Sequence, residues 1–184
     1  NIALNTISAL HSLVAANGMT IEGNPSLNNL SGLHSLSSVM NDLSIRSNPG
    51  LTNLVGLDSL AILGSLHISG NSGLTSLTGF SPSLTSINDL MVIEDNTALS
   101  SLNGLNALNS IGGIQLINND ALVDLTGLNA LTTIGSSPGY LYINDNNALT
   151  GLSGLNALKT IEGDLFINLN FSLISLSGID SLTS

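Results

Sequence analysis

The residues best suited to chemistry in this chain are acids and amides that recur at one position of a repeated pattern. Asp95, Asn118 and Asp145 are each followed at once by an asparagine, and they stand 23 and 27 residues apart in consecutive repeats. If each repeat forms one coil of a stack, these side chains lie about 4.8 Å apart along its axis. Oxygen ligands of this kind suit Ca²⁺, so the three residues are the candidate metal site. Because no known calcium-repeat motif is present, solvated acids in turns are the favoured alternative, and no cofactor is expected.

Nucleophilic catalysis would need a nucleophile, a base and an orienting group within hydrogen-bond reach of one another. The three histidines, His11, His34 and His67, fall at different positions of the repeated pattern. They are therefore not expected to converge, and we predict surface histidines and no enzymatic activity.

These side chains belong to the pattern I-x-G-x-L-x-I-x-x-N-x-x-L-x-x-L-x-G-L, which occurs seven times. Successive L-x-I pairs begin 24, 23, 25, 23, 27 and 24 residues apart. A period of about 20–29 residues is typical of a solenoid. Alternation of apolar and polar residues predicts a short strand with one buried face in every repeat. The pairs are Met19/Ile21, Leu43/Ile45, Leu66/Ile68, Met91/Ile93, Ile114/Leu116, Leu141/Ile143 and Leu165/Ile167.

An asparagine follows every strand pair at the same distance. A stacked column of amides can satisfy buried backbone groups where the chain turns a corner. The pattern therefore predicts an inward-pointing asparagine ladder. Its members are Asn24, Asn48, Asn71, Asn96, Asn119, Asn146 and Asn170.

Glycine closes the leucine-rich segment of every repeat, which predicts backbone with φ above zero or a close approach between coils. These glycines are Gly32, Gly56, Gly79, Gly104, Gly127, Gly154 and Gly178. Residue types that tolerate the left-handed region also stand two positions before each strand pair, and they predict that conformation there. These residues are Asn17, Asn41, Gly64, Asp89, Gly112, Gly139 and Gly163.

The repeat resembles leucine-rich repeats and, more closely, the receptor L-domain, whose repeats carry the same L-x-I-x-x-N and L-x-G-L elements. The resemblance covers nearly the whole chain. It implies a right-handed, all-β-rich solenoid of about seven coils, in which residues 1–184 form one domain. Residues 1–16 are then a partial first coil and residues 17–184 are seven full coils. Receptor L-domains occur in insulin-receptor and EGF-receptor ectodomains and in fungal GPI-anchored cell-wall proteins, so the resemblance implies an extracellular or cell-surface location.

The composition of the chain excludes some classes of binding partner. The 184 residues carry a formal net charge of −10, with 12 acids against Arg46 and Lys159 as the bases. Nucleic-acid binding depends on basic residues, so we expect no nucleic-acid partner. No apolar run approaches the length that spans a bilayer, and a membrane-spanning segment is not expected. The returns at Phe80–Ser83 and Gly135–Gly139 are lengthened and are expected to bulge from one edge.

Two faces of the expected solenoid are candidate binding surfaces. On the first strand, the outward residues end in Tyr142 and Phe166, a pair that can hold a sugar or a peptide. The second face flanks the middle leucine of L-x-x-L-x-G with short polar residues, on a grid of about 4.8 Å by roughly 6.7 Å. This flat array resembles the faces of β-solenoid ice-binding proteins. Its candidate residues are Ser76, Thr78, Ser101, Asn103, Thr126, Ser153, Ser175 and Ser177.

We therefore expect a non-catalytic recognition or adhesion module that presents a rigid face to a protein, a glycan or a cell-wall surface. Ice binding through the second face is one alternative. The other is a structural subunit that stacks end to end into a filament, because neither end looks capped. The same ends are also expected if the chain is part of a longer protein. The apolar residues left open are Ile2, Leu4, Ile7 and Leu10 in the first coil, and Leu173, Leu176, Ile179 and Leu182 in the last.

Overall fold

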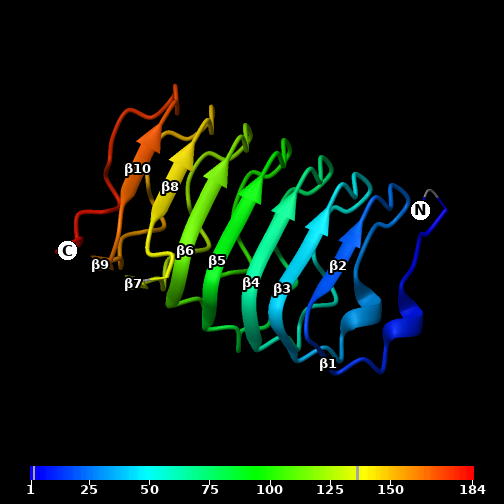
Figure 1. Ribbon diagram of the computed structural model, residues 1–184. Coiled ribbons are helices and arrows are strands. Elements are labelled where there is room, and N and C mark those ends of the chain that lie inside the picture. The colour runs from blue at the N-terminus through cyan, green and yellow to red at the C-terminus, as the bar shows by residue number, and fades with distance from the viewer. Residues whose placement is uncertain (2, 136) are drawn as a thin grey trace.

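The computed structural model, which describes residues 1, 3–135 and 137–184, is a β-solenoid of about six turns. Figure 1 shows its strands as a row of parallel arrows, with the N-terminus at one end of the stack and the C-terminus at the other. The sequence predicts about seven coils, and all seven predicted strands are present. Seven strands enclose only six turns, because a turn is complete only when the chain returns to the next strand.

All ten strands belong to one parallel sheet. The three shortest, β1 (Ala15–Ala16), β7 (Thr133–Ile134) and β9 (Thr160–Ile161), pair with other strands of the sheet at the start of their coils. Two 3₁₀ turns, η1 (Ser8–Leu10) and η2 (Ser31–Leu33), lie in the first two coils. The strands that carry the apolar pairs are β2 (Met19–Glu22), β3 (Ser38–Arg46), β4 (Ile62–Ser69), β5 (Ser86–Glu94), β6 (Ser110–Ile117), β8 (Leu141–Asn144) and β10 (Leu165–Asn168).

The core is a stack of leucine and isoleucine columns that runs through the middle coils. Within β8, Leu141 and Ile143 are fully buried while Tyr142 and Asn144 are half-buried on the other face, as alternation requires. Leucines of the L-x-x-L-x-G segment, such as Leu102, close the core from the opposite side. Burial of one such side chain contributes about 1.5–3 kcal/mol, so the columns are the main stabilising feature.

The asparagine ladder predicted from the repeat is present. The Asn48 amide donates to the backbone carbonyl oxygens of Ile21 and Arg46, at 2.9 Å each. Its own oxygen accepts the backbone N–H of Asn24, and the Asn48 N–H donates to the amide oxygen of Asn71. Asn48, Asn71, Asn96, Asn119 and Asn146 are fully buried.

The glycine bends also behave as predicted, because side chains have no room there. Gly104 has a φ of +123°, and an added Cβ would overlap the backbone carbonyl of Leu77 in the preceding coil. Gly32 lacks the positive φ, but an added Cβ there would overlap the carbonyl of Ile7. A positive φ between 112° and 130° recurs at Gly56, Gly79, Gly127, Gly154 and Gly178.

The predicted left-handed conformation two residues before each strand pair is wrong at six of the seven positions, since only Gly139 has a positive φ there. At Gly163 the reason for glycine is close approach, because an added Cβ would lie 2.7 Å from the Gly139 carbonyl oxygen. The left-handed residues stand instead one position before the ladder. They have φ between 53° and 67° and are Gly23, Ser47, Gly70, Asp95, Asn118, Asp145 and Leu169.

Two β-bulges interrupt the regular stacking. On β3, Met40 and Asn41 stand opposite the single residue Gly64 of β4. On β5, Asn88 and Asp89 likewise stand opposite Gly112 of β6. A bulge bends its strand and re-aims the side chains next to it. The two bulges therefore flank β4 and change the shape of the outer sheet face there.

Candidate functional site

The outer face of the sheet carries the most varied side chains of the molecule. Strand register places Asp42 beside Ser65 and places Leu90 beside Gly113 in the row that follows the bulges. In the next outward row, Ser44 lies beside His67, and His67 lies beside Val92. Acids, a histidine and apolar side chains thus meet within three adjacent coils.

Ser137 and Pro138 of the lengthened return form one wall of this region. Its Gly139 N–H donates to the Gly112 carbonyl at 2.8 Å. An added Cβ on Gly113 would lie 2.7 Å from Cγ of Pro138, so Pro138 rests on a strand position that has no side chain. Pro138 and Gly139 of the return that was expected to bulge are therefore packed against β6, and we name this part the ridge.

Two adjoining hollows, of about 400 Å³ and about 410 Å³, open between this ridge and the bulge of β3. They share Asp42, Ser65 and Asp89, and together we name them the outer-face groove. One hollow is also lined by Leu66, His67, Leu90, Val92, Pro138 and Tyr140, and the other by Met40, Asn41, Gly64, Asn88 and Ser137. Both are large enough for one small ligand unit.

Electrostatics in the groove are dominated by carboxylates. Burial raises the pKa of Asp42 above its ordinary value of 3.8, although the charges of His67 and Arg46 lower it in part. Neither Asp42 nor Asp89 accepts a hydrogen bond from any residue that the structure describes. By contrast, Glu94 pairs with Nε2 of His67 at 2.9 Å. The groove therefore offers a ligand two carboxylates to which no described residue donates a hydrogen bond.

The tyrosine at the rim is held in place by a neighbouring strand. Nε2 of Gln115 donates to the Tyr140 hydroxyl oxygen at 2.6 Å, and this bond fixes the ring beside Pro138. Tyr142 and Phe166 lie farther along the same face, on β8 and β10, with ring centroids 5.8 Å apart and planes at 57°. The structure thus brings the predicted aromatic pair together and adds a third ring that sequence reasoning missed.

The backbone conformation accounts for the residue types at the candidate calcium positions. Asp95, Asn118 and Asp145 all occupy the left-handed position before the ladder, where Asp, Asn and Gly are tolerated best. The Asn118 amide donates to Asp95 at 2.6 Å, and Asp145 accepts a 3.2 Å hydrogen bond from Asn147. Within residues 1, 3–135 and 137–184, no group of three or more His, Cys, Asp or Glu is arranged to hold a metal. Calcium stays an untested prediction.

The second face is more regular, and part of it serves the backbone. Side chains just before the middle leucine cap nearby N–H groups, as Asp124 does for Thr126 at 2.9 Å and Ser175 for Ser177 at 3.0 Å. Ser76 and Thr78 bond to each other at 2.9 Å. Of the predicted face residues, Ser76, Ser101 and Thr126 are half-buried, and Thr78, Asn103, Ser153, Ser175 and Ser177 are exposed. Sequence reasoning missed an outer column of exposed hydroxyls, Thr52, Thr75, Ser100 and Thr150.

The apolar residues predicted to lie open at the two ends are only partly so. Leu10 is 38% exposed and Leu176 is 52% exposed. Ile2 lies outside the described residues. The other five are half-buried, and they are Leu4, Ile7, Leu173, Ile179 and Leu182. Of these, Ile7, Leu173, Ile179 and Leu182 pack against the core. Filament assembly through these ends stays a prediction.

The groove residues Asp42, Asp89, Pro138 and Tyr140 were not predicted as a site. A partial signal was present, because the coils with a bulge or a long return have 24, 25 and 27 residues and two plain coils have 23, although the last coil also has 24 without either feature. That difference marks where the repeat is interrupted. It does not say that β4, a plain strand between two bulged ones, becomes the floor of a groove.

Among the described residues, no helix is long and apolar enough to cross a membrane. No protein-family model, curated protein or solved structure gives a significant match to the chain.

Proposed function

We propose that this protein is a non-catalytic recognition or adhesion module of the extracellular space or cell surface. It presents the outer face of its sheet to a protein, a glycan or a cell-wall surface. The observation that carries this proposal is the outer-face groove, a hollow with free carboxylates and apolar walls on an otherwise repetitive scaffold. The resemblance of the repeat to the receptor L-domain supports the location and the role.

Rigidity favours recognition through this face. The Asn ladder and the buried leucine columns fix each coil relative to the next. The backbone positions that carry the groove side chains are therefore set before a partner arrives, which reduces the ordering cost of binding. Free carboxylates, a tyrosine and small polar groups on one fixed surface are the groups that small-ligand and protein sites use for orientation and specificity.

The histidines support binding over catalysis. His11 and His34 bond to backbone carbonyls within their own turns, at 3.1 Å and 2.9 Å. His67 is engaged by Glu94. Each histidine thus has a structural partner, and none of the three lies beside a serine or threonine hydroxyl to which it is hydrogen-bonded.

The chain has no cysteine, so a single introduced thiol can carry a bulky blocking group. Val92→Cys places the label on the outer face, and Thr78→Cys places the same label on the second face as the matched control. Binding to purified cell walls and to intact cells is then measured for each labelled variant. We expect the Val92 label to reduce binding at least tenfold and the Thr78 label to leave it unchanged. Equal binding by both labelled variants would exclude the outer face.

Ice binding is the second candidate, favoured by the exposed hydroxyl and amide columns of the second face. Thr78→Lys places a bulky charge on this face without touching the core. If the face binds ice, this change abolishes thermal hysteresis while the far-ultraviolet circular dichroism stays the same. Absence of hysteresis and of ice-crystal shaping in the unmodified protein would end this alternative.

A further inference from the structure

The outer-face groove has a charge and shape that select among ligands, and the inference drawn from them rests on the proposed recognition function. We propose that the groove binds a saccharide unit bearing a free amino group, with the ammonium between Asp42 and Asp89 and the ring against Pro138 and Tyr140. The contacts that support this assignment come from three sides of the groove.

Charge selects a cation. Asp42 and Asp89 come from bulged strands on opposite sides of β4, and both line the two hollows of the groove. Both carboxylates lack hydrogen-bond donors among the described residues, whereas Glu94 is neutralised in part by His67. A carboxylate without a hydrogen-bond donor favours a positively charged group beside it, and a protonated amine satisfies this need.

The apolar side of the groove favours a particular kind of group to carry the ammonium. Leu90, Val92, Pro138 and Tyr140 line the same hollow as the carboxylates. The C–H face of a sugar ring packs against aliphatic and aromatic side chains of this kind, while its substituents stay available for polar contacts. Since the Gln115 hydrogen bond fixes the tyrosine, the wall is formed before the ligand binds.

Further polar groups favour a sugar over a simple amine. Ser65 lies on β4, between the strands that carry the two aspartates, and the adjoining hollow adds Asn41 and Asn88. A lysine side chain has only methylenes behind its ammonium and would leave these groups unused. Ring hydroxyls can pair with several of them at once.

A divalent metal does not account for the same groups. The described residues contain no cluster of three or more His, Cys, Asp or Glu with a geometry that could hold a metal ion. Two carboxylates next to a hydrophobic wall suit an organic cation, because its ammonium can pair with the carboxylates and its ring can pack against the wall.

The test is isothermal titration of the whole chain with two probes of equal length. One is an oligosaccharide of β-1,4-linked glucosamine with free amines, and the other is its fully N-acetylated counterpart. We expect the free-amine probe to bind and the acetylated probe to bind at least tenfold more weakly, because acetylation removes the charge. A lysine-containing peptide of equal charge serves as the third arm.

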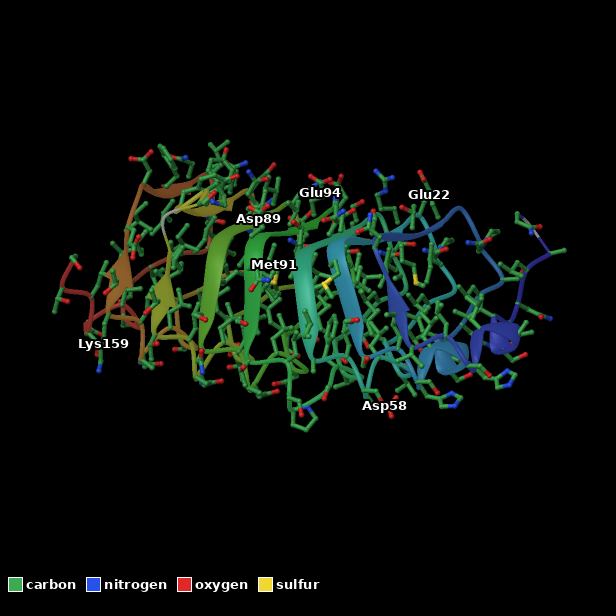
Figure 2. The ribbon with its side chains drawn as sticks, turned by 60° about the horizontal axis from the view of Figure 1, so that its bottom comes forward. Glu22, Asp58, Asp89, Met91, Glu94 and Lys159 are labelled. Carbon is green, nitrogen blue, oxygen red and sulfur yellow. The ribbon has the colours of Figure 1, made fainter. Side chains whose placement is uncertain are left out.

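Variants locate the site. Asp42→Asn combined with Asp89→Asn is expected to weaken binding of the free-amine probe at least tenfold. Asp58→Asn is the matched control, since this exposed acid lies on the opposite side of the molecule from Asp89 and Glu94 (Figure 2). Circular dichroism and thermal melting check that each variant is folded. Ser65→Ala adds a milder change within the groove that removes one hydrogen-bonding group and no charge.

The proposal is overturned if the free-amine probe does not bind, if acetylation makes no difference, if the lysine peptide binds as tightly, or if the Asp42/Asp89 variant binds normally. These results leave the proposed function standing as long as the labelled Val92→Cys variant still loses its cell-wall or cell binding. If that label has no effect while the sugar binds in the groove, the recognition role of the outer face fails instead.

Discussion

The Asn ladder and the outer-face groove lie on the same coils, yet they differ in how far their polar groups are satisfied. In the ladder, Asn96 bonds to the backbone of Asn71, Ile68 and Glu94, and its side chain is fully buried. In the groove, Asp42 and Asp89 accept no hydrogen bond from the described residues. The ladder repeats in every coil, whereas the groove is formed where bulges and a long return interrupt the repeat.

This difference indicates where function can reside in a repetitive fold. Positions that are the same in every coil are occupied by groups that the fold itself requires. Positions that depart from the pattern are free of that requirement, and their unpaired groups remain available to a ligand. The experiments that follow test this division, beginning with the repeat.

The largest effect is expected from a side chain at a glycine bend. Gly104→Ala combines an unfavourable φ with overlap against the Leu77 carbonyl, and should lower the free energy of unfolding by about 2–6 kcal/mol. Chemical denaturation measures the change. Gly23→Ala is the control, because Gly23 also has a positive φ but has open space around it, and should lose only about 1–2 kcal/mol. Equal losses would show that close approach between coils is unimportant.

The next largest effect is expected within the ladder. Asn96→Ala leaves the N–H of Asn71 and the carbonyls of Ile68 and Glu94 without this partner, and should lower stability by about 2–4 kcal/mol. Asn109→Ala removes an exposed amide and should stay within about 0.5 kcal/mol of the parent. Thermal and urea unfolding compare the two. A loss at Asn96 no larger than at Asn109 would contradict the ladder's stabilising role.

Stability should depend on the backbone conformation of the residue before the ladder and not on its charge. Asp95→Gly is expected to stay within about 0.5 kcal/mol of the parent, and Asp95→Val to lose about 1–3 kcal/mol, because a β-branched residue resists a positive φ. Both are measured by thermal melting with and without millimolar calcium. A rise of the melting temperature with calcium that disappears in Asp95→Gly would instead support the metal site.

The smallest effect is expected in the groove. Because the folded-state pKa of Asp42 is raised above 3.8, its contribution to stability is present below 3.8 and is lost as pH rises through the folded-state pKa. Asp42→Asn should therefore raise the free energy of unfolding at neutral pH by no more than about 0.5 kcal/mol, and thermal melting measures the change. The gain should shrink as pH falls towards 3.8. Lower stability of the variant at neutral pH would show that the carboxylate has a structural partner.

Much of the scaffold could be predicted from the sequence, because local rules repeat in each coil. The L-x-I alternation predicted the strands, and the invariant spacing of Asn96 and Gly104 within their repeat predicted an inward amide and a tight bend. The candidate site was less predictable. Asp95 and Asp145 drew attention as oxygen ligands, although a left-handed backbone accounts for their types.

The sequence by itself determined the solenoid, its hydrophobic columns and the ladder, since each depends on a period that can be counted along the chain. Only the tertiary structure decided the groove. Asp42, Asp89 and Pro138 lie 47 and 49 residues apart in the chain, and they meet because bulges on β3 and β5 flank a plain strand while a later return packs over Gly113. Such contacts depend on how unlike coils stack side by side, which no single repeat encodes.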